Sequence, residues 1–176
     1  MKKIKILTTI IIFILSFLFH FMYDLLPSFI NSILFPVNES IFEHMKIIFT
    51  SILFTSIIEL IIYKKRNINV NNFILNIPIV SIVSIIVYLI IYLIVDKFIG
   101  HNTIFSIGLL FIIYIFSQIL SYNILNYKKI KYGNIIGLLL IFIIYYIFYL
   151  LTYNPIHTYI FLDPITGIYG IKKSNI

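Results

Sequence analysis

Five long stretches of the chain are apolar at almost every position. They are Ile4–Leu26, Ser40–Tyr63, Phe73–Val95, Thr103–Asn126 and Asn134–Thr152. Each is long enough to cross the hydrocarbon core of a bilayer as an α-helix, which takes about 20 mostly apolar residues. The pattern therefore predicts an all-α fold, a polytopic transmembrane helical bundle with about five spans.

The segments between these stretches are short, so neighbouring helices are expected to be antiparallel. They are Pro27–Glu39, Lys64–Asn72, Asp96–Asn102 and Tyr127–Gly133. The first apolar stretch begins near basic residues, as in a signal peptide, but it is longer than an ordinary h-region and no small-residue cleavage site follows it. We therefore expect it to be retained as a span. The predicted domains are a bundle over residues 1–152 and a tail over residues 153–176.

The composition supports this fold class. Of the 176 residues, 61% are hydrophobic and 11% are charged, and the mean hydropathy is +1.09. A soluble domain of this size cannot hide so many apolar side chains, which excludes a soluble enzyme, a disordered chain and a secreted disulfide scaffold. Cysteine is absent, so thiolate metal sites and cysteine nucleophiles are also excluded. The lack of alanine, the single arginine and the many isoleucines are typical of an AT-rich bacterial genome.

Lysine and arginine are distributed unequally between the two ends of the predicted bundle. One end receives Lys2, Lys3, Lys5, Lys64, Lys65, Arg66, Lys128, Lys129 and Lys131, and the other receives Lys46, Lys97, Lys172 and Lys173. Because basic residues favour the cytoplasmic side, the sequence predicts a bacterial cytoplasmic membrane protein with a cytoplasmic N-terminus and an extracytoplasmic C-terminus. The net charge of +7 thus reflects orientation in the lipid bilayer, and it gives no reason to expect nucleic acid as a partner.

The histidines and acidic residues follow the opposite distribution. Only Glu59 lies near the predicted cytoplasmic end. The others lie at or beyond the extracytoplasmic ends of the spans: His20, His44, His101, His157, Asp24, Glu39, Glu43, Asp96 and Asp163. Ionisable groups at membrane depth cost about 2.5–3.5 kcal/mol each and usually face a cavity or a partner. A functional site is therefore expected at the extracytoplasmic face.

The start of the second span combines a helix cap with further ionisable residues. Ser40 and Glu43 fit the S-x-x-E capping box, which satisfies free N–H groups at a helix start. That cap does not account for Glu39, His44 and Lys46, which arrive within the same two turns. Glu39 and Glu43 are expected to share a helix face. The segment is either a structural cap alone or a cap that also builds a polar site.

Two other segments can reach the same level. His20 and Asp24 are four residues apart, so they are expected to share a face of the first span, either as part of a site or as a local hydrogen-bonded pair. The tail contains two prolines and two glycines before residue 171, so we expect it to be ordered, non-helical, extracytoplasmic and packed on the bundle. It can deliver His157 and Asp163 over the first two helices, or it can be an ordered cap with surface polar groups.

Other polar residues are expected to have structural roles. Gln118, Tyr122 and Asn126 form a row at intervals of four residues, which is typical of interhelical hydrogen bonding. Asn38 and Asn154 belong to the same structural class. Glu59 is expected to pair with the basic loop that follows its helix.

The second-span motif resembles that of a known family. Val37-Asn38-Glu39-Ser40-Ile41-Phe42-Glu43-His44-Met45-Lys46 is similar to the Val-Asn-Glu-Ser-Val-Trp-Glu-His-Leu-Lys of an uncharacterised bacterial family of small multi-pass membrane proteins, a domain of unknown function. The run at His20, Tyr23 and Asp24 and the tail from Asn154 to Gly170 also resemble this family. The resemblance covers most of the chain and implies relatives, but it implies no reaction.

The first hypothesis is an intramembrane enzyme that opens to the extracytoplasmic face and uses a divalent metal. Glu39 or Glu43 is the expected general acid and base. The candidate metal ligands are His20, His44, His157 and Asp163, and Asp24 and Lys46 join them as candidate ligands or proton carriers. A lipid or lipid-linked substrate suits the depth of such a site.

Two other hypotheses remain open. A small transporter subunit would use the same groups as a solute or proton relay, but the apolar runs Ile79–Val95 and Leu138–Leu151 argue against it. An accessory or structural membrane protein would use the polar cluster only to order the extracytoplasmic end of the bundle.

Overall fold

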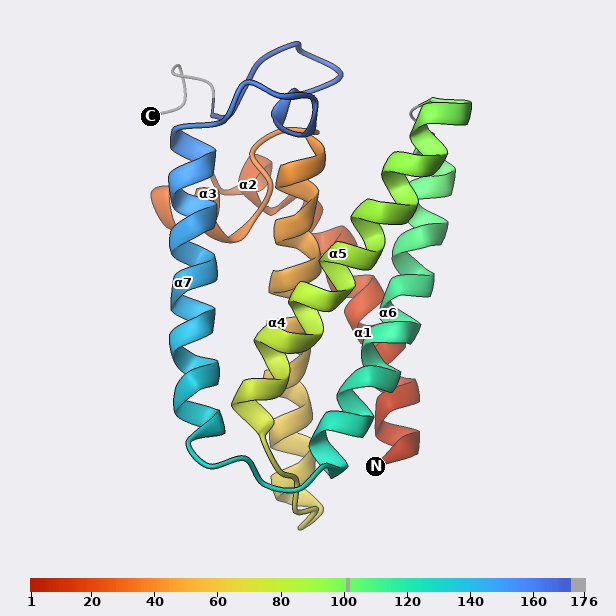
Figure 1. The fold of residues 1–176 in the computed structure, drawn as a ribbon, viewed down its shortest axis with the longest axis vertical. Helices are drawn as coiled ribbons and strands as arrows, with labels where there is room; N and C mark the ends of the chain where they lie inside the picture. Colours follow the sequence, from red (N-terminus) through yellow and green to blue (C-terminus); the bar gives the residue numbers. More distant parts are fainter. Residues whose placement is uncertain (101, 172–176) are drawn as a thin grey trace.

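The computed structural model describes residues 1–100 and 102–171 as a helical bundle (Figure 1). The predictions for His101, Lys172 and Lys173 concern residues outside this description. The long helices are α1 (Lys2–His20), α4 (Ile41–Lys65), α5 (Phe73–Ile99), α6 (Thr103–Asn126) and α7 (Gly133–Tyr153). Two short helices, α2 (Met22–Leu25) and α3 (Phe29–Leu34), and a 3₁₀ turn, η1 (Tyr159–Phe161), complete the described elements. The predicted all-α bundle is confirmed.

The four helices α1, α4, α5 and α6 form a closed ring in which each packs on two neighbours. α1 packs against α4 and α6, and α5 packs against the same two helices from the other side. α7 lies outside this ring, along α5 and beside α3 (Figure 1). All five long helices are long and apolar enough to span a bilayer, and they indicate a multi-pass membrane protein.

The first span ends earlier than the sequence predicts. α1 stops at His20, and Phe21 has φ −96° and ψ −1°, so the chain turns there before α2. The predicted connection Pro27–Glu39 contains α3, which begins at Ser28, whose hydroxyl accepts a hydrogen bond from the Asn31 N–H. Both departures involve helices of six residues or fewer, too short to be recognised from hydrophobic periodicity.

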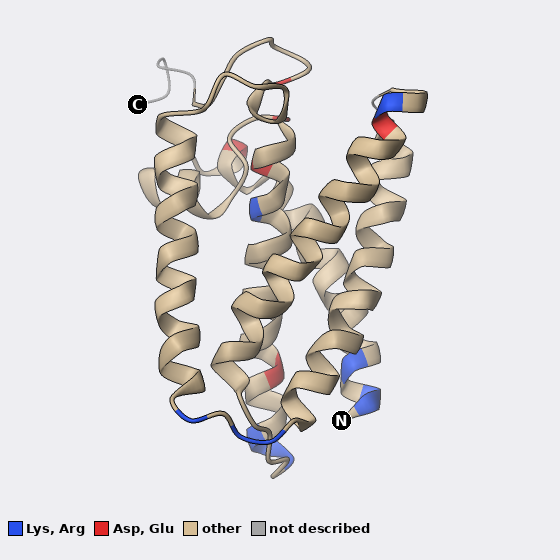
Figure 2. Cartoon of the chain, in the orientation of Figure 1, with Lys and Arg blue, Asp and Glu red and all other residues tan. Residues whose placement is uncertain are grey.

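Charged residues separate along the bundle. Figure 2 shows most lysines and arginines at the end that holds the N-terminus and most acidic residues toward the other end. Two ionic pairs are nevertheless buried inside the bundle, one near each end. This separation is the one that the sequence pattern indicates.

The pair near the N-terminal end joins Lys5 of α1 to Glu59 of α4. Lys5 Nζ lies 2.6 Å from Glu59 Oε2, and the two side chains are 6% and 1% exposed. Lys5 also donates to the Ser121 hydroxyl, and Thr8 donates to Glu59 Oε1. The expectation that Glu59 pairs with the basic loop is therefore wrong, because α1 packs directly on α4 and brings a lysine to it within the bundle.

The tail lies across the other end of the bundle. The Phe161 ring stacks on Phe42 of α4, with ring centroids 4.6 Å apart. Tyr159 donates to Asp96 Oδ2 of α5 over 2.5 Å, and this hydrogen bond raises the pKa of the phenol above its ordinary value. The tail thus contacts both α4 and α5 through described side chains. Its assignment to a separate domain stays a prediction.

One glycine permits the close approach of α7 to α5. A Cβ atom added at Gly137 would lie 2.5 Å from the Leu75 backbone, closer than atoms can pack. Gly108 of α6 is the opposite case, because a Cβ there meets nothing within 4 Å. Small residues of this kind let helix backbones pack closely in membranes.

We predict that Gly137→Ala separates α7 from α5 and lowers the free energy of unfolding by about 1–3 kcal/mol. Gly108→Ala is the matched control, and it should leave stability unchanged or raise it by roughly 1 kcal/mol or less. Thermal unfolding of both variants in detergent micelles measures the difference. Equal melting temperatures would contradict the close contact at Gly137.

We also predict that Lys5→Met lowers the free energy of unfolding by about 3–5 kcal/mol, because it leaves the Glu59 carboxylate buried without a counter-charge. The double variant Lys5→Met/Glu59→Gln should recover most of this loss, since it buries no charge and Gln can still accept from Thr8. Melting temperatures of the two variants test the pair. If the double variant is no more stable than the single one, the loss comes from packing and not from the unpaired charge.

Candidate functional site

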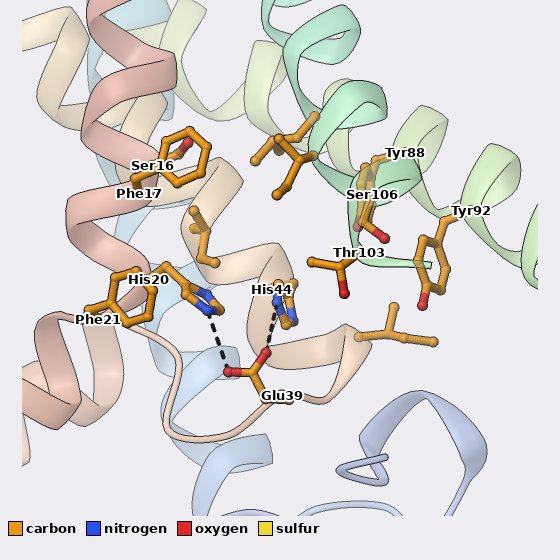
Figure 3. A pocket seen from close by; sticks show the side chains of 14 residues that line it. Ser16, Phe17, His20, Phe21, Glu39, His44, Tyr88, Tyr92, Thr103 and Ser106 are labelled. Atoms are coloured by element: carbon orange, nitrogen blue, oxygen red, sulfur yellow. Dashed lines mark ion pairs between the residues drawn. The ribbon is translucent and has the colours of Figure 1, made fainter. Parts of the chain in front are cut away.

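A cavity of about 220 Å³ lies between α1 and α4 on one side and α5 and α6 on the other (Figure 3). Its walls are mainly apolar and include Phe17, Phe21, Ile47 and Leu110. Two histidines and one glutamate also line it, and these are His20, His44 and Glu39. Two short stretches of chain, the end of α1 and the start of α4, thus place a polar cluster beside an apolar space.

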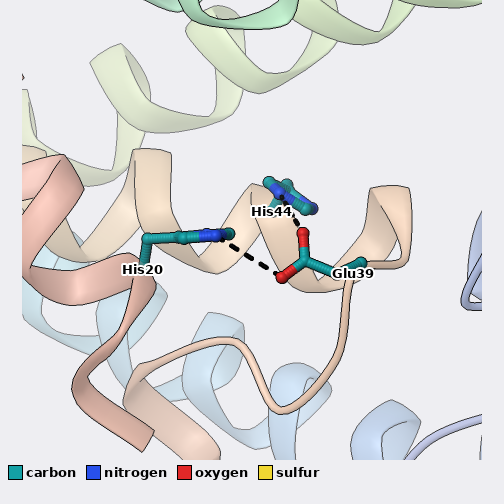
Figure 4. Close-up of side chains that lie close together, drawn as sticks. All are labelled: His20, Glu39 and His44. Atoms are coloured by element: carbon teal, nitrogen blue, oxygen red, sulfur yellow. Dashed lines mark ion pairs between the residues drawn. The ribbon is translucent and has the colours of Figure 1, made fainter. Parts of the chain in front are cut away.

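The three ionisable side chains lie close together in space (Figure 4). Glu39 Oε1 is 3.4 Å from His20 Nε2, and Glu39 Oε2 is 3.5 Å from His44 Nε2. The two imidazole rings have centroids 5.3 Å apart. Each residue can offer one ligand atom such that all three atoms lie within 4.8 Å of one another. We refer to His20, Glu39 and His44 as the His–Glu–His cluster.

The backbone around Glu39 is fixed by its neighbours. Ser40 is the N-cap of α4, and its hydroxyl accepts from the Glu43 N–H over 3.3 Å. Asn38 accepts from the Ser40 N–H and donates to the Gly170 carbonyl in the tail. Glu39 therefore projects from a short segment held on both sides, which orients its carboxylate toward the two histidines.

A hydrogen bond determines which nitrogen of His44 carries the proton. His44 Nδ1 lies 2.9 Å from the Ser40 carbonyl oxygen, which can only accept. Nδ1 is therefore the protonated nitrogen of the neutral ring, and Nε2 presents a lone pair toward the Glu39 carboxylate. Histidines that bind metals in other proteins are often oriented in this way, by a hydrogen bond from the ring nitrogen that does not bind the metal.

A second cavity, of about 190 Å³, lies on the other side of the cluster. His20 and Glu39 line both cavities. The walls of the second cavity are more polar, and they include Asp24, Asn38 and Thr166. The His–Glu–His cluster therefore stands between an apolar cavity and a polar one.

Glu43 and Lys46 point away from the cluster and form a buried pair of their own. Glu43 Oε2 lies 2.6 Å from Lys46 Nζ, and the side chains are 1% and 0% exposed. The Glu43 carboxylate also accepts from the Val37 N–H and from Thr152 of α7, and Lys46 donates to the Ser32 carbonyl of α3. Glu39 and Glu43 do not share a face, because Glu39 precedes the first turn of α4.

Two candidates from the tail lie apart from the cluster. Asp163 is buried, and its carboxylate accepts from the Ile165 N–H and the Thr166 hydroxyl, which closes a turn. Asp163 lines the second cavity together with His20 and Glu39, but it is not part of the His–Glu–His cluster. His157 is exposed and stacks on Tyr169, with ring centroids 4.5 Å apart. The structure thus brings His20 and His44 together but not His157.

The remaining sequence candidates have varied surroundings. Asp24 lines the second cavity and is exposed, since the turn at Phe21 separates it from the helix of His20. Gln118 is buried, whereas Tyr122 is only partly buried and lies 6.0 Å from Lys2 Nζ. Asn126 donates to the Tyr122 carbonyl within its own helix. Asn154 is exposed and follows the last residue of α7.

The sequence analysis missed the wall of the cavity that faces the cluster. Tyr88 and Tyr92 of α5 and Thr103 and Ser106 of α6 line it, opposite His20 in Figure 3. Their intervals of four and three residues place each pair on one helix face. That spacing was a usable signal, but it involves no histidine or carboxylate and is equally typical of ordinary helix packing.

Comparison with known proteins gives a family but no activity. No curated protein and no solved structure shows significant similarity to the chain. A family model does match, and it confirms the expected membership of an uncharacterised family. Residues 1–171 match DUF6512, a family of unknown function, and the chain belongs to that family.

Proposed function

We propose that the protein is a membrane-embedded, zinc-dependent hydrolase whose metal is held by His20, Glu39 and His44. The observation that carries the proposal is the orientation of His44. Its Nε2 lone pair faces a carboxylate oxygen 3.5 Å away, with the ring proton committed to Ser40. Two electron-rich atoms in this arrangement repel each other unless a proton or a metal cation lies between them. Because 3.5 Å is longer than a charge-assisted hydrogen bond of about 2.7–2.9 Å, we assign the cation to a divalent metal.

The distances within the cluster fit a tetrahedral ion. Charge-assisted hydrogen bonds are about 2.7–2.9 Å long, so separations of 3.4 and 3.5 Å are too long for direct bonding. Zinc bonds of about 2.0–2.2 Å give ligand–ligand distances of about 3.3–3.6 Å in a tetrahedron, and octahedral geometry at the same bond length gives about 2.8–3.1 Å. The two histidines face different oxygens of Glu39, so a single ion requires the carboxylate either to bind through both oxygens or to turn one oxygen toward both histidines.

Two histidines, one glutamate and an open fourth position are a donor set of catalytic zinc sites. Zinc bound in this way lowers the pKa of a bound water and polarises a carbonyl group. The second oxygen of Glu39 can accept the proton of the attacking water and pass it to the leaving group. In this proposal Glu39 takes the role of ligand and proton carrier, whereas Glu43 supports the fold.

The site lies on the extracytoplasmic side in this proposal. The Lys and Arg asymmetry favours a cytoplasmic N-terminus in a bacterial cytoplasmic membrane. The bilayer is then the source of substrate, and nucleic acid has no role.

A proton or ion relay is the second candidate, and one observation favours it. Buried hydroxyls of Ser16, Ser51 and Thr55 lie along the ring between the His–Glu–His cluster and the Lys5–Glu59 pair. The side chains of Ile12 and Ile48, each 0% exposed, lie at the same levels of α1 and α4. The Tyr114 hydroxyl lies close to those of Ser16 and Ser51, but neither α1 between Lys5 and His20 nor α4 between Lys46 and Glu59 carries a histidine or carboxylate that could pass a proton on. We therefore favour the hydrolase.

Metal analysis of the purified protein tests the proposed centre. We expect about one zinc ion per chain, and zinc binding more than about 100-fold weaker in His44→Ala and Glu39→Gln, because each changes a direct ligand and even the loss of a group behind a ligand costs about 10- to 100-fold. His157→Ala is the matched control, because this exposed histidine lies outside the cluster, and it should bind zinc as the unsubstituted chain does.

Glu43→Gln separates the structural role from the metal role. It should lower the melting temperature while the folded protein keeps its zinc. Equal zinc content in all four variants would contradict the assignment of the ligands. If the unsubstituted protein binds no zinc, the accessory or structural function is favoured instead. Stoichiometric iron in place of zinc would point to the oxygen chemistry of a two-histidine, one-carboxylate site.

The lack of cysteine makes the orientation directly testable, because each introduced cysteine is unique in the chain. Asn69, in the loop between α4 and α5, and Thr158, in the tail, are both exposed. We expect a membrane-impermeant maleimide to label Thr158→Cys in intact cells and Asn69→Cys only after permeabilisation. The reverse pattern would place the His–Glu–His cluster on the cytoplasmic side.

A further inference from the structure

We infer that the substrate is a single-chain amphiphile, with a hydrolysable acyl head at the His–Glu–His cluster and an alkyl chain in the apolar cavity between α1, α4 and α6. This inference rests on the proposed metal centre and adds the class of molecule that the centre acts on.

The two cavities that meet at the cluster have opposite chemistry. On one side, Phe17, Ile47 and Leu110 form the wall. On the other side, Asp24 and Thr166 contribute carboxylate and hydroxyl groups. A ligand that fills the apolar cavity and also reaches the cluster must carry an apolar part and a polar part, joined near His20 and Glu39.

The apolar cavity borders the outer surface of the bundle. Phe17 of α1, Phe21 just after α1 and Ile107 of α6 line the cavity, yet they are 41%, 52% and 37% exposed. Side chains that belong both to the cavity wall and to the apolar exterior of spanning helices face the lipid phase. An alkyl chain can therefore pass from the bilayer into the cavity between α1 and α6 without crossing water.

The wall opposite the histidines carries hydroxyl groups. Thr103 and Ser106 of α6 lie across the cavity from His20 in Figure 3. The Thr103 hydroxyl can donate a hydrogen bond to a carbonyl or alcohol oxygen of an acyl head, whereas the Ser106 hydroxyl donates to the Asn102 carbonyl and can only accept from the head. The polar cavity on the far side of Glu39 then offers a route for the attacking water and for the released polar product.

The cavity size restricts the apolar part to one chain. A volume of about 220 Å³ is smaller than the pockets that hold drug-sized ligands, which are about 300–1,000 Å³. One alkyl segment fits this space, and the two chains of a diacyl lipid do not.

The proposed reaction is the hydrolysis of the acyl head by water. Water adds to the carbonyl carbon of the acyl head, and the bond from that carbon to the leaving oxygen or nitrogen breaks. Zinc held by His20, Glu39 and His44 would lower the pKa of that water. The proton taken from water goes to the leaving group. Water is the only co-reactant, and no electrons are exchanged with another molecule.

Alkyl hydroxamates of two lengths test the inference, since both carry the same zinc-binding head. Zinc-loaded protein in lipid nanodiscs is titrated with acetohydroxamate and octanohydroxamate, and the same titrations on metal-stripped protein are subtracted. We expect both to bind only when zinc is present. Because the long chain also partitions into lipid, variants of the cavity wall provide the decisive comparison.

Leu110→Trp fills the apolar cavity, and Ile107→Trp fills it from the margin, so either one keeps the test valid if the other fails to fold. We expect octanohydroxamate to bind each about tenfold more weakly than the unsubstituted protein, with acetohydroxamate affinity and zinc content unchanged. Ile112→Trp is the matched control, since Ile112 is 60% exposed on the same helix and does not line the cavity.

Three results overturn the inference in distinguishable ways. If octanohydroxamate binds all the tryptophan variants and the unsubstituted protein equally, the alkyl chain does not occupy the cavity. If zinc is bound stoichiometrically but neither hydroxamate binds in a zinc-dependent way, the centre has no open position for a substrate. If the unsubstituted protein binds no zinc, the proposed function fails first and the amphiphile inference fails with it.

Discussion

The buried pair of Glu43 and Lys46 is the interaction on which this end of the molecule depends. Its two side chains bond to α3, to the segment before α4 and to α7, through Ser32, Val37 and Thr152. In an apolar interior an unpaired charge costs several kcal/mol. Each charge of the pair therefore requires its partner and the groups that hydrogen-bond to it to stay in place. The short helices, the loop and the last span are thereby joined to α4 around one ionic centre.

This support explains how two glutamates four residues apart come to have different surroundings. Glu43 lies inside the first turn of α4, fully buried and saturated with hydrogen bonds. Glu39 lies just before the helix with a side chain that is 40% exposed, and its two oxygens face His20 and His44 at 3.4 and 3.5 Å. The rigid network of Glu43 holds the segment that presents Glu39, so a structural pair and a candidate metal site share one stretch of chain.

The five spans could be predicted because burial in a bilayer leaves a composition signal along the whole length of a helix. The turn at Phe21 and helix α3 left no such signal, because short elements are determined by tertiary contacts and not by periodicity. For the same reason, the sequence could not define which residues make up the site. The sequence indicated that His20, Glu39 and His44 lie at one level, but it also indicated His157 and Asp163 there. Only the packing separates the first three from a stacked surface histidine and a turn-forming aspartate.

The sequence by itself determined that the chain is a helical membrane protein, which family motif it carries, and that its histidines and most of its acids gather toward one end. These properties depend on residue type and position alone, since the bilayer selects apolar runs and the helix start selects its cap. The tertiary structure decided which partner each charged group takes: Lys5 for Glu59, Lys46 for Glu43, and His20 with His44 for Glu39. Pairing depends on which helices become neighbours in the ring, and that choice is made by the packing of whole helix faces.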